Sequence, residues 1–153
     1  MDIEQLTSMI VAAKAATYVG GGITAEPSRP GSHDLGWSQG RWRYLDSYFG
    51  GTDFLGQETI WLDDAPVWAM NYYGYILRRD LIDGQRAGET IKAALSAMYR
   101  EGRFLGGFDW TGPHGQYRDT STGDARHFTG RETIIVQGEQ AYALDYFGGL
   151  IRP

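Results

Sequence analysis

The sequence predicts an α+β fold in which two α-β-β-β units form a pseudo-twofold antiparallel sheet with two helices. Three observations support this prediction. Two segments place apolar residues at helical spacing, six segments look like strands, and one strand pair occurs twice along the chain. The 153 residues suit one domain spanning 1–153, with repeat units at about 2–77 and 86–151.

The first unit is expected to begin with a helix and to continue with three strands. Asp2 is a suitable N-cap, and apolar residues follow it at helical spacing to about residue 17. Residues 20–39 are rich in glycine, proline and serine, so we expect a long loop there. Strands are expected at 41–48, 57–62 and 67–77, and Pro66 belongs at the start of the third because proline lacks an amide donor.

The second unit is predicted to follow the same order. Residues 78–85 form a polar linker, and apolar spacing from Ile91 to Met98 indicates a second helix that ends near Gly102. Three further strands are expected at 116–119, 127–136 and 140–150.

An internal repeat relates the two units. Residues 54–77 align with residues 128–151 without a gap, at an offset of 74 residues, and are identical at eight of 24 positions. The alternation of apolar and polar residues in strands does not by itself explain why both copies contain Gly-x-Glu-Thr-Ile and Ala-x-x-Tyr-x-Gly at the same offset. We therefore infer a duplication. Upstream, residues 40–43 resemble residues 115–118. Two copies are too few for a solenoid, so the half-domains are expected to pack together.

Composition limits the classes of partner. The net charge of −5 and the dispersed arginines argue against direct binding to nucleic acid. No apolar run approaches the ~18 residues that a membrane helix needs, and the N-terminal residues do not resemble a signal peptide. The absence of cysteine rules out disulfides and fits a cytoplasmic location.

The aromatic residues predict a ligand pocket between the two repeats. Both faces of the strands are largely apolar, which also fits a closed sheet, a homodimer interface or a wholly structural core. Positions at which the copies differ are the best candidates for ligand binding, namely Trp61, Trp68 and Asn71, with Tyr72 beside them. The second copy has Glu132 at the position of Glu58. Two such glutamates suit structural hydrogen bonds, a cation site or acid–base chemistry.

The segment from Ser28 to Leu35 has no counterpart in the second unit. It gathers Arg29, Ser32, His33 and Asp34. Arg29 could hold an anion with two parallel hydrogen bonds, and His33 is a weak candidate for a general base oriented by Asp34 or another carboxylate. The alternative is that these residues only form a turn. All of them are candidate ligand-binding residues.

No metal site or cofactor is expected. The three histidines lack the paired spacing of metal ligands. The glycines at 20–22 and 106–107 follow helices instead of opening them, so they are not phosphate-binding loops.

Four segments resemble an uncharacterised bacterial family known as domain of unknown function 5680. They are SRPGSHDL at 28–35, DSYFGG at 46–51, PVWAMNYYG at 66–74 and YFGGLI at 146–151. The resemblance spans most of residues 18–151 and implies a bacterial or phage protein. Family members occur alone or fused to helix-turn-helix regulators, which implies a small-molecule-sensing module, and this chain is expected to be the stand-alone form. No catalytic residues are established for the family.

Three functions therefore remain open. The leading hypothesis is a non-catalytic small-molecule-binding domain, a sensor or sequestering protein, whose ligand is planar, cationic or nucleotide-like. The second is a small hydrolase or isomerase that uses His33 with a carboxylate. The third is a homodimeric interaction or inhibitor protein.

Overall fold

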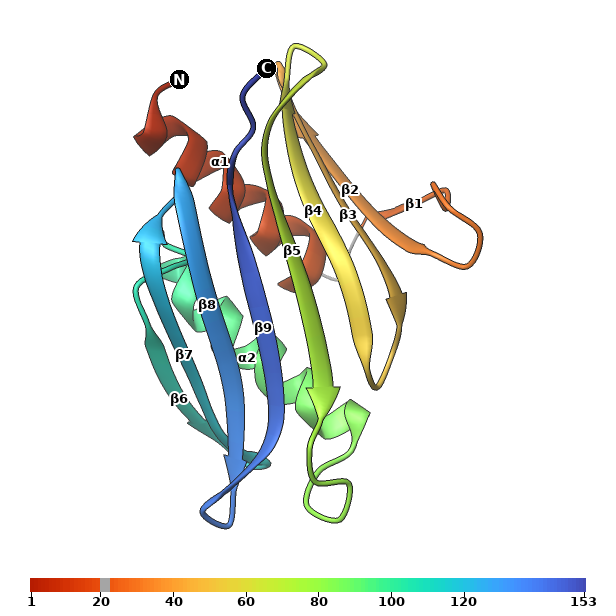
Figure 1. Ribbon diagram of the computed structural model, residues 1–153, viewed down its shortest axis with the longest axis vertical. Coiled ribbons are helices and arrows are strands. Elements are labelled where there is room, and N and C mark those ends of the chain that lie inside the picture. The colour runs from red at the N-terminus through yellow and green to blue at the C-terminus, as the bar shows by residue number, and fades with distance from the viewer. Residues whose placement is uncertain (20–22) are drawn as a thin grey trace.

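The computed structural model describes residues 1–19 and 23–153, which form nine strands and two α-helices (Figure 1). The helices are α1 (Ile3–Lys14), which continues as the π-helical segment η1 (Ala15–Val19), and α2 (Gly84–Arg100). The strands are β1 (Thr24–Ala25), β2 (His33–Gln39), β3 (Trp42–Gly50), β4 (Phe54–Leu62), β5 (Ala65–Ile76), β6 (Phe108–Gly112), β7 (Gly115–Asp124), β8 (His127–Val136) and β9 (Glu139–Leu150).

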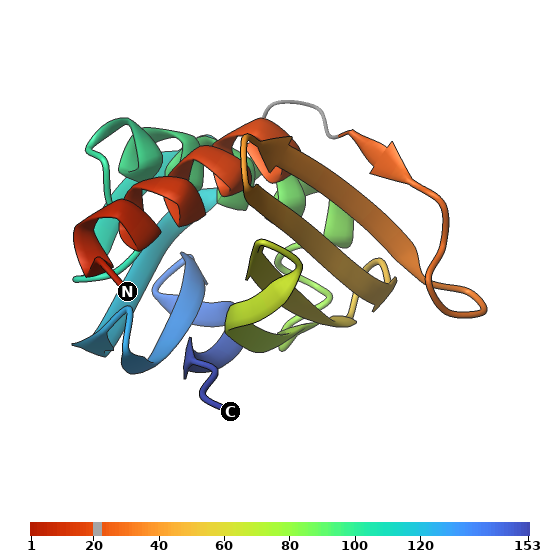
Figure 2. The ribbon, with the colours of Figure 1, turned by 90° about the horizontal axis from the view of Figure 1, so that it is seen from above.

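All nine strands belong to one antiparallel sheet. Its order is β1-β2-β3-β4-β5-β9-β8-β7-β6, so β5 and β9 are neighbours although they are far apart in the sequence. Figure 2 shows that the sheet is strongly curved and that α1 and α2 both lie on its concave side. The hydrophobic core lies between the helices and this concave face.

Each helix begins at an aspartate and buries one apolar face. The Asp2 carboxylate accepts hydrogen bonds from the amides of Glu4 and Gln5, and the Asp83 carboxylate accepts one from Arg86. Both helices direct residues at helical spacing toward the sheet. Those that are almost fully buried include Leu6, Ile10 and Ala13 of α1, and Ala87, Ile91, Ala94 and Met98 of α2.

The prediction of an α+β fold with an antiparallel sheet and two helices is confirmed. The predicted loop at 20–39 is wrong for residues 33–39, because β2 pairs with β3 along its whole length, from His33 opposite Tyr48 to Gln39 opposite Trp42. Residues 20–22 lie outside the described residues. Strands β1 and β6 were also not predicted. β1 has two residues, and β6 has five half-buried or exposed residues, so neither has a clear apolar pattern.

The two halves of the sheet share several local features. Tyr72 of β5 lies directly opposite Tyr146 of β9, and the β4–β5 and β8–β9 pairs both shift register, after Ile60 and after Ile134. The upstream resemblance of 40–43 to 115–118 corresponds to an offset of 75 residues. Tyr44 lies opposite Ile60 and Tyr117 opposite Ile134, which gives an offset of 73. The duplication itself stays a prediction.

The convex face of the sheet carries several exposed apolar side chains. Leu55 of β4 lies opposite Tyr73 of β5, and Phe147 of β9 lies opposite Asn71 of β5. Leu55, Tyr73 and Phe147 are 54%, 47% and 57% exposed. One face of the sheet therefore packs against the core, and the other face is exposed. The predicted homodimer stays a prediction.

Candidate functional site

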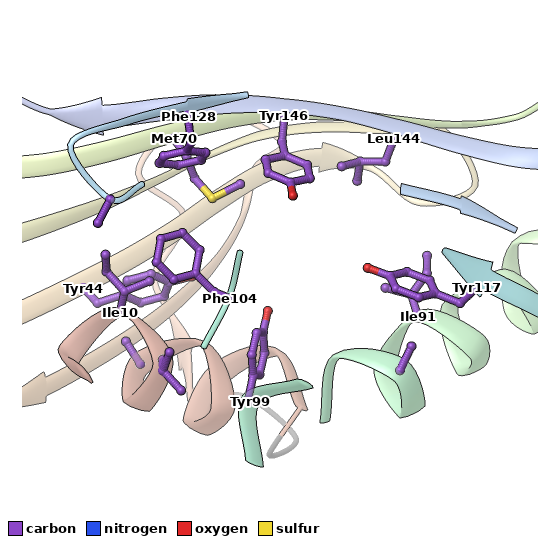
Figure 3. Close-up of a cluster of buried hydrophobic side chains, with 14 of the residues drawn as sticks. Ile10, Tyr44, Met70, Ile91, Tyr99, Phe104, Tyr117, Phe128, Leu144 and Tyr146 are labelled. Carbon is purple, nitrogen blue, oxygen red and sulfur yellow. The ribbon is translucent and has the colours of Figure 1, made fainter. Parts of the chain in front are cut away.

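A cavity of about 220 Å³ lies between the concave face of the sheet and the two helices. It is lined from both halves of the chain, by α1, β3, β4 and β5 on one side and by α2, β7, β8 and β9 on the other. Figure 3 shows the hydroxyl groups of Tyr99, Tyr117 and Tyr146 directed into the space between sheet and helices. The ionisable lining groups other than tyrosines are Lys14, Asp46, Glu58, Asp119 and Glu132.

The first pair of acids holds a buried lysine. Asp46 and Glu58 lie opposite each other on β3 and β4, and both are about 95% buried. The Nζ of Lys14, on α1, lies 2.6 Å from both carboxylate oxygens of Glu58 and 3.6 Å from the sulfur of Met70. The hydroxyl of Tyr72 donates to Asp46 Oδ1 at 2.5 Å. Burial, together with the charge of Glu58, raises the pKa of Asp46 to about 7.

The second pair of acids repeats this arrangement without the lysine. Asp119 and Glu132 lie opposite each other on β7 and β8, and the Tyr146 hydroxyl donates to Asp119 Oδ1 at 2.7 Å. Burial, together with the charge of Asp119, raises the pKa of Glu132 to about 8, and burial also raises the pKa of Asp119. Glu132 Oε2, Asp119 Oδ2 and the hydroxyl of Tyr142 are buried with no hydrogen-bond partner in the described part of the chain.

Two glycines allow the tyrosines to reach these acids. The ring of Tyr72 crosses its strand neighbour Gly56, and the ring of Tyr146 crosses Gly130. A Cβ atom on either glycine would overlap the tyrosine that crosses it. The absence of a side chain at these two positions therefore fixes the direction in which each phenol points.

We expect Gly56→Ala to lower the free energy of unfolding by about 2–4 kcal/mol, measured by urea denaturation at pH 7. The added methyl group displaces Tyr72, so the hydrogen bond to Asp46 is lost. Gly88→Ala is the matched control, since a Cβ there meets nothing within 4 Å and alanine favours a helix by about 0.5–1 kcal/mol. A Gly56→Ala variant as stable as the wild type would contradict this account.

Of the predicted ligand-binding residues, Glu58 and Tyr72 line the cavity. The tryptophans do not. Trp68 is fully buried in the core, where its ring stacks on Phe128 at 5.8 Å, and Trp61 lies beneath the guanidinium of Arg43 at 5.1 Å. Asn71 accepts a hydrogen bond from its cross-strand neighbour Gln57. The structure therefore does not bring the predicted set together.

The residues from Ser28 to Leu35 form a separate structural cluster outside the cavity. Arg29 donates to the carbonyl and hydroxyl oxygens of Ser47 at 3.1 and 2.8 Å, and its guanidinium lies 4.5 Å from the Phe49 ring centroid. His33 is exposed, with its ring 5.2 Å from that of Tyr48, whereas Asp34 is buried. Consecutive residues of a strand point to opposite faces, so Asp34 does not orient His33.

Asp34 instead accepts hydrogen bonds from three serines. They are the amide of Ser28 at 3.0 Å and the hydroxyls of Ser32 at 2.7 Å and Ser47 at 2.8 Å. Burial by itself would raise the pKa of Asp34, but these hydrogen bonds outweigh it and lower the pKa to about 2. Ser32 and Asp34 therefore stabilise the turn before β2.

We expect Asp34→Asn to lower the free energy of unfolding by about 2 kcal/mol at pH 7. The pKa of Asp34 is lower in the folded state than in the unfolded state, so its stabilisation is present above pH 4 and is lost as the pH falls toward 2. Urea unfolding of both proteins should therefore converge across that range. Asp109→Asn, at an exposed ion pair, is the control and should change stability by less than about 0.5 kcal/mol. A difference that persists at pH 2 would contradict the assignment.

The described residues include no group of three or more histidine, aspartate or glutamate side chains placed to hold a metal ion. No helix among them is both long and apolar enough to cross a bilayer. The prediction that residues 20–22 are not a phosphate-binding loop concerns residues that lie outside the described part of the chain.

Sequence reasoning missed Lys14, Asp46, Asp119, Tyr142 and Tyr146 as members of the site. Asp119 follows Asp46 by 73 residues, whereas the repeated hairpin has an offset of 74, so a gapless alignment does not match the two acids. Lys14 could have been noticed, because it is a single charge among the alanines of α1. Its partner on β4 could not have been inferred from local spacing.

The fold and the cavity together define an α+β protein whose curved antiparallel sheet and two helices enclose a cavity lined by carboxyl and phenol groups. The sequence matches the family described as Domain of unknown function (DUF5680) over residues 46–151, and the chain belongs to this family. The matched region contains both acid pairs, but not Lys14 or residues 28–35. No curated protein and no solved structure matches the chain significantly. The bacterial or phage host and the cytoplasmic location stay predictions.

Proposed function

We propose that the protein binds one small molecule in the cavity without transforming it, as a sensor or a sequestering protein. The observation that carries this proposal is the set of buried polar atoms without partners at Glu132, Asp119 and Tyr142. An unsatisfied buried polar atom costs about 1–3 kcal/mol, and folded proteins rarely retain one without a reason. A ligand that supplies the missing hydrogen bonds is such a reason.

The charges in the cavity favour a cationic ligand over a nucleotide-like one. Four carboxyl groups line it, whereas Lys14 is the only basic side chain in its lining among the described residues. A phosphate group placed there would meet further negative charge in a poorly solvated space. The remaining lining includes Met70, Ile91 and Leu144, so the rest of the ligand is apolar.

Helix α2 keeps room for this ligand. Gly84, Gly88, Ile91 and Leu95 follow one another at helical spacing along its cavity side. A Cβ atom on Gly88 would meet nothing, yet glycine in a helix interior is less stable than alanine by about 0.5–1 kcal/mol. Packing therefore does not require this glycine, and the absence of a large side chain there leaves the cavity wall open.

A thermal-shift screen of small amines, aromatic compounds and nucleotides tests the proposal. A ligand at 100 times its dissociation constant should add ~2.7 kcal/mol to the free energy of unfolding. Gly88→Leu fills the cavity from α2 and should abolish the shift, whereas Gly88→Ala should largely keep it. If nothing in the screen stabilises the wild-type protein at millimolar concentration, the proposal fails.

Catalysis is a second candidate, favoured by one observation. With pKa values of about 7 and about 8, Asp46 and Glu132 could give or accept protons near neutral pH. A hydrolase or isomerase would then use these acids rather than His33, which lacks an orienting carboxylate. Liquid chromatography coupled to mass spectrometry of each stabilising compound, after incubation with wild type and Glu132→Gln, detects hydrolysis products by their mass and isomers by their retention time. Unchanged compounds in both samples exclude this candidate.

We also infer that the two halves descend from one duplicated unit, a helix followed by a four-stranded meander, which has one strand more than the predicted α-β-β-β unit. The matching register shifts, the paired tyrosines and the two Asp–Glu pairs support this inference. Sequences of relatives would test it, since a duplication predicts that the two halves of distant members resemble each other more than chance allows.

A further inference from the structure

We propose that the ligand is a primary amine whose ammonium group binds between Asp119 and Glu132. This inference rests on the proposed function and names the chemical class that the cavity selects. It draws on three observations: an internal example of the interaction, the absence of a bonded cation at the second acid pair among the described residues, and the two unpaired carboxylate oxygens of that pair.

Lys14 provides the internal example. Its primary ammonium enters the cavity from α1 and lies 2.6 Å from both oxygens of Glu58, next to Asp46. The side chains of Lys14 and Glu58 are only 10% and 8% exposed. The fold thus already holds one desolvated primary ammonium against an Asp–Glu pair from neighbouring strands, beside a tyrosine that bonds the aspartate.

The second Asp–Glu pair has the same form, and no lysine or arginine side chain of the described residues donates to it. Asp119 and Glu132 are cross-strand neighbours like Asp46 and Glu58, and Tyr146 bonds Asp119 as Tyr72 bonds Asp46. The nearby Arg103 does not occupy the position. Its guanidinium donates to Glu101 and to the carbonyls of Leu105 and Gly107.

The unpaired atoms of the second acid pair match a primary ammonium in kind. Glu132 Oε2 and Asp119 Oδ2 belong to residues that line the cavity and are more than 90% buried. The buried hydroxyls of Tyr117 and Tyr142 also lack partners, but the Tyr142 hydroxyl lies over Gly74 of β5, away from this pair. A primary ammonium has three N–H donors and can bond both carboxylate oxygens. A quaternary ammonium has none, and an alcohol has one donor and no charge to offset a carboxylate.

The cavity volume limits the remainder of the ligand. An engineered apolar cavity of about 150 Å³ in another protein holds benzene. The present volume of about 220 Å³ therefore suits one ring or a short alkyl chain in addition to the ammonium group. Ile91 and Leu144 border the same space as Tyr99 and Tyr146, and they would contact this apolar part (Figure 3).

Titration calorimetry with three probes that share one phenylethyl group tests the inference. The probes are 2-phenylethylamine, 2-phenylethanol and trimethyl(2-phenylethyl)ammonium, and the protein variants are wild type, Glu132→Gln, Asp119→Asn and the exposed control Glu89→Gln. The amine should bind the wild type at least about tenfold more tightly than either other probe. Glu132→Gln and Asp119→Asn should each weaken the amine by at least about tenfold and leave the alcohol unchanged, while Glu89→Gln should change neither.

The outcomes separate this inference from the proposed function. If the alcohol binds as tightly as the amine and Gly88→Leu abolishes both, the cavity is a binding site but the assignment of an ammonium is wrong. If the amine binds tightly and both acid variants keep its affinity, its position between Asp119 and Glu132 is wrong. If no probe binds the wild type at millimolar concentration, the assignment of a primary amine is overturned, while the thermal-shift screen still decides the proposed function. If binding survives Gly88→Leu, the cavity is not the binding site and both proposals are overturned.

Discussion

Glu132→Gln is expected to raise the free energy of unfolding by about 3–5 kcal/mol at pH 8 and to leave it nearly unchanged at pH 5. Burial raises the pKa of Glu132 to about 8 in the folded protein, whereas an unfolded chain has the ordinary glutamate value. The folded state therefore binds a proton that the unfolded state releases, and wild-type stability falls as the pH rises from about 4.5 to 8. Glutamine resembles the protonated acid and does not titrate.

The groups that face Glu132 determine how large this effect is. Asp119 raises its pKa further, whereas Tyr117 and Lys14 lower it. Urea unfolding of both proteins at a series of pH values gives the difference directly. Glu26→Gln, at an exposed position, serves as the control and should show no comparable dependence on pH. If Glu132→Gln is less stable than the wild type at pH 8, Glu132 is ionised and paired in the folded protein.

This expected gain has a functional meaning. A single substitution that stabilises the protein and removes ammonium binding would show that Glu132 is retained at the expense of stability. Buried groups that destabilise the fold are typical of binding and catalytic sites. The stability experiment and the calorimetry thus examine the same carboxyl group through independent measurements.

Lys14→Met is expected to lower the free energy of unfolding by about 3–5 kcal/mol at pH 7. The substitution keeps the length of the side chain but leaves the Glu58 carboxylate buried without its ammonium partner. Asp46 lies opposite Glu58, so the uncompensated charge also faces a second acid. Chemical denaturation monitored by circular dichroism measures the change.

A double variant separates the ion pair from simple packing. Lys14→Met combined with Glu58→Met removes both charges, and replacing a buried pair by apolar residues of similar volume is often neutral or stabilising. The double variant should therefore recover most of the loss. Lys92→Met on the exposed face of α2 is the control. A single variant that loses less than about 1 kcal/mol would show that the pair contributes little.

Local patterns in the sequence were enough for the helices and the long hairpins, because periodicity and capping residues determine them within a few residues. The same patterns did not reveal β2. Its buried residue Asp34 is polar, since it bonds the serines around it, so the strand lacks an apolar alternation. A prediction from hydrophobic spacing cannot recognise a strand whose inward side chain is a hydrogen-bonded acid.

The site was harder to predict than the fold. Glu58 and Tyr72 were among the predicted residues, but the tryptophans were preferred for their aromatic rings, and Trp68 fills the core instead. Alternation tells which residues face the helices, and not whether they meet side chains or an open cavity. The ion pair joins Lys14 to Glu58, which are 44 residues apart in the sequence, and it depends on how α1 crosses the sheet.

The pairing of β5 with β9 has a consequence for how the chain acquires its site. From β2 to β5, and again from β6 to β9, each strand pairs with the next one along the chain, whereas β5 and β9 join residues 65–76 to residues 139–150. Such long-range closure is entropically costly and slow, so we expect both meanders to form first. Pulse-labelling hydrogen exchange during refolding should show the β5–β9 amides protected last. During synthesis, Tyr142 and Tyr146 are the last cavity-lining residues to be made, so a growing chain cannot complete the cavity until β9 has left the ribosome and paired with β5.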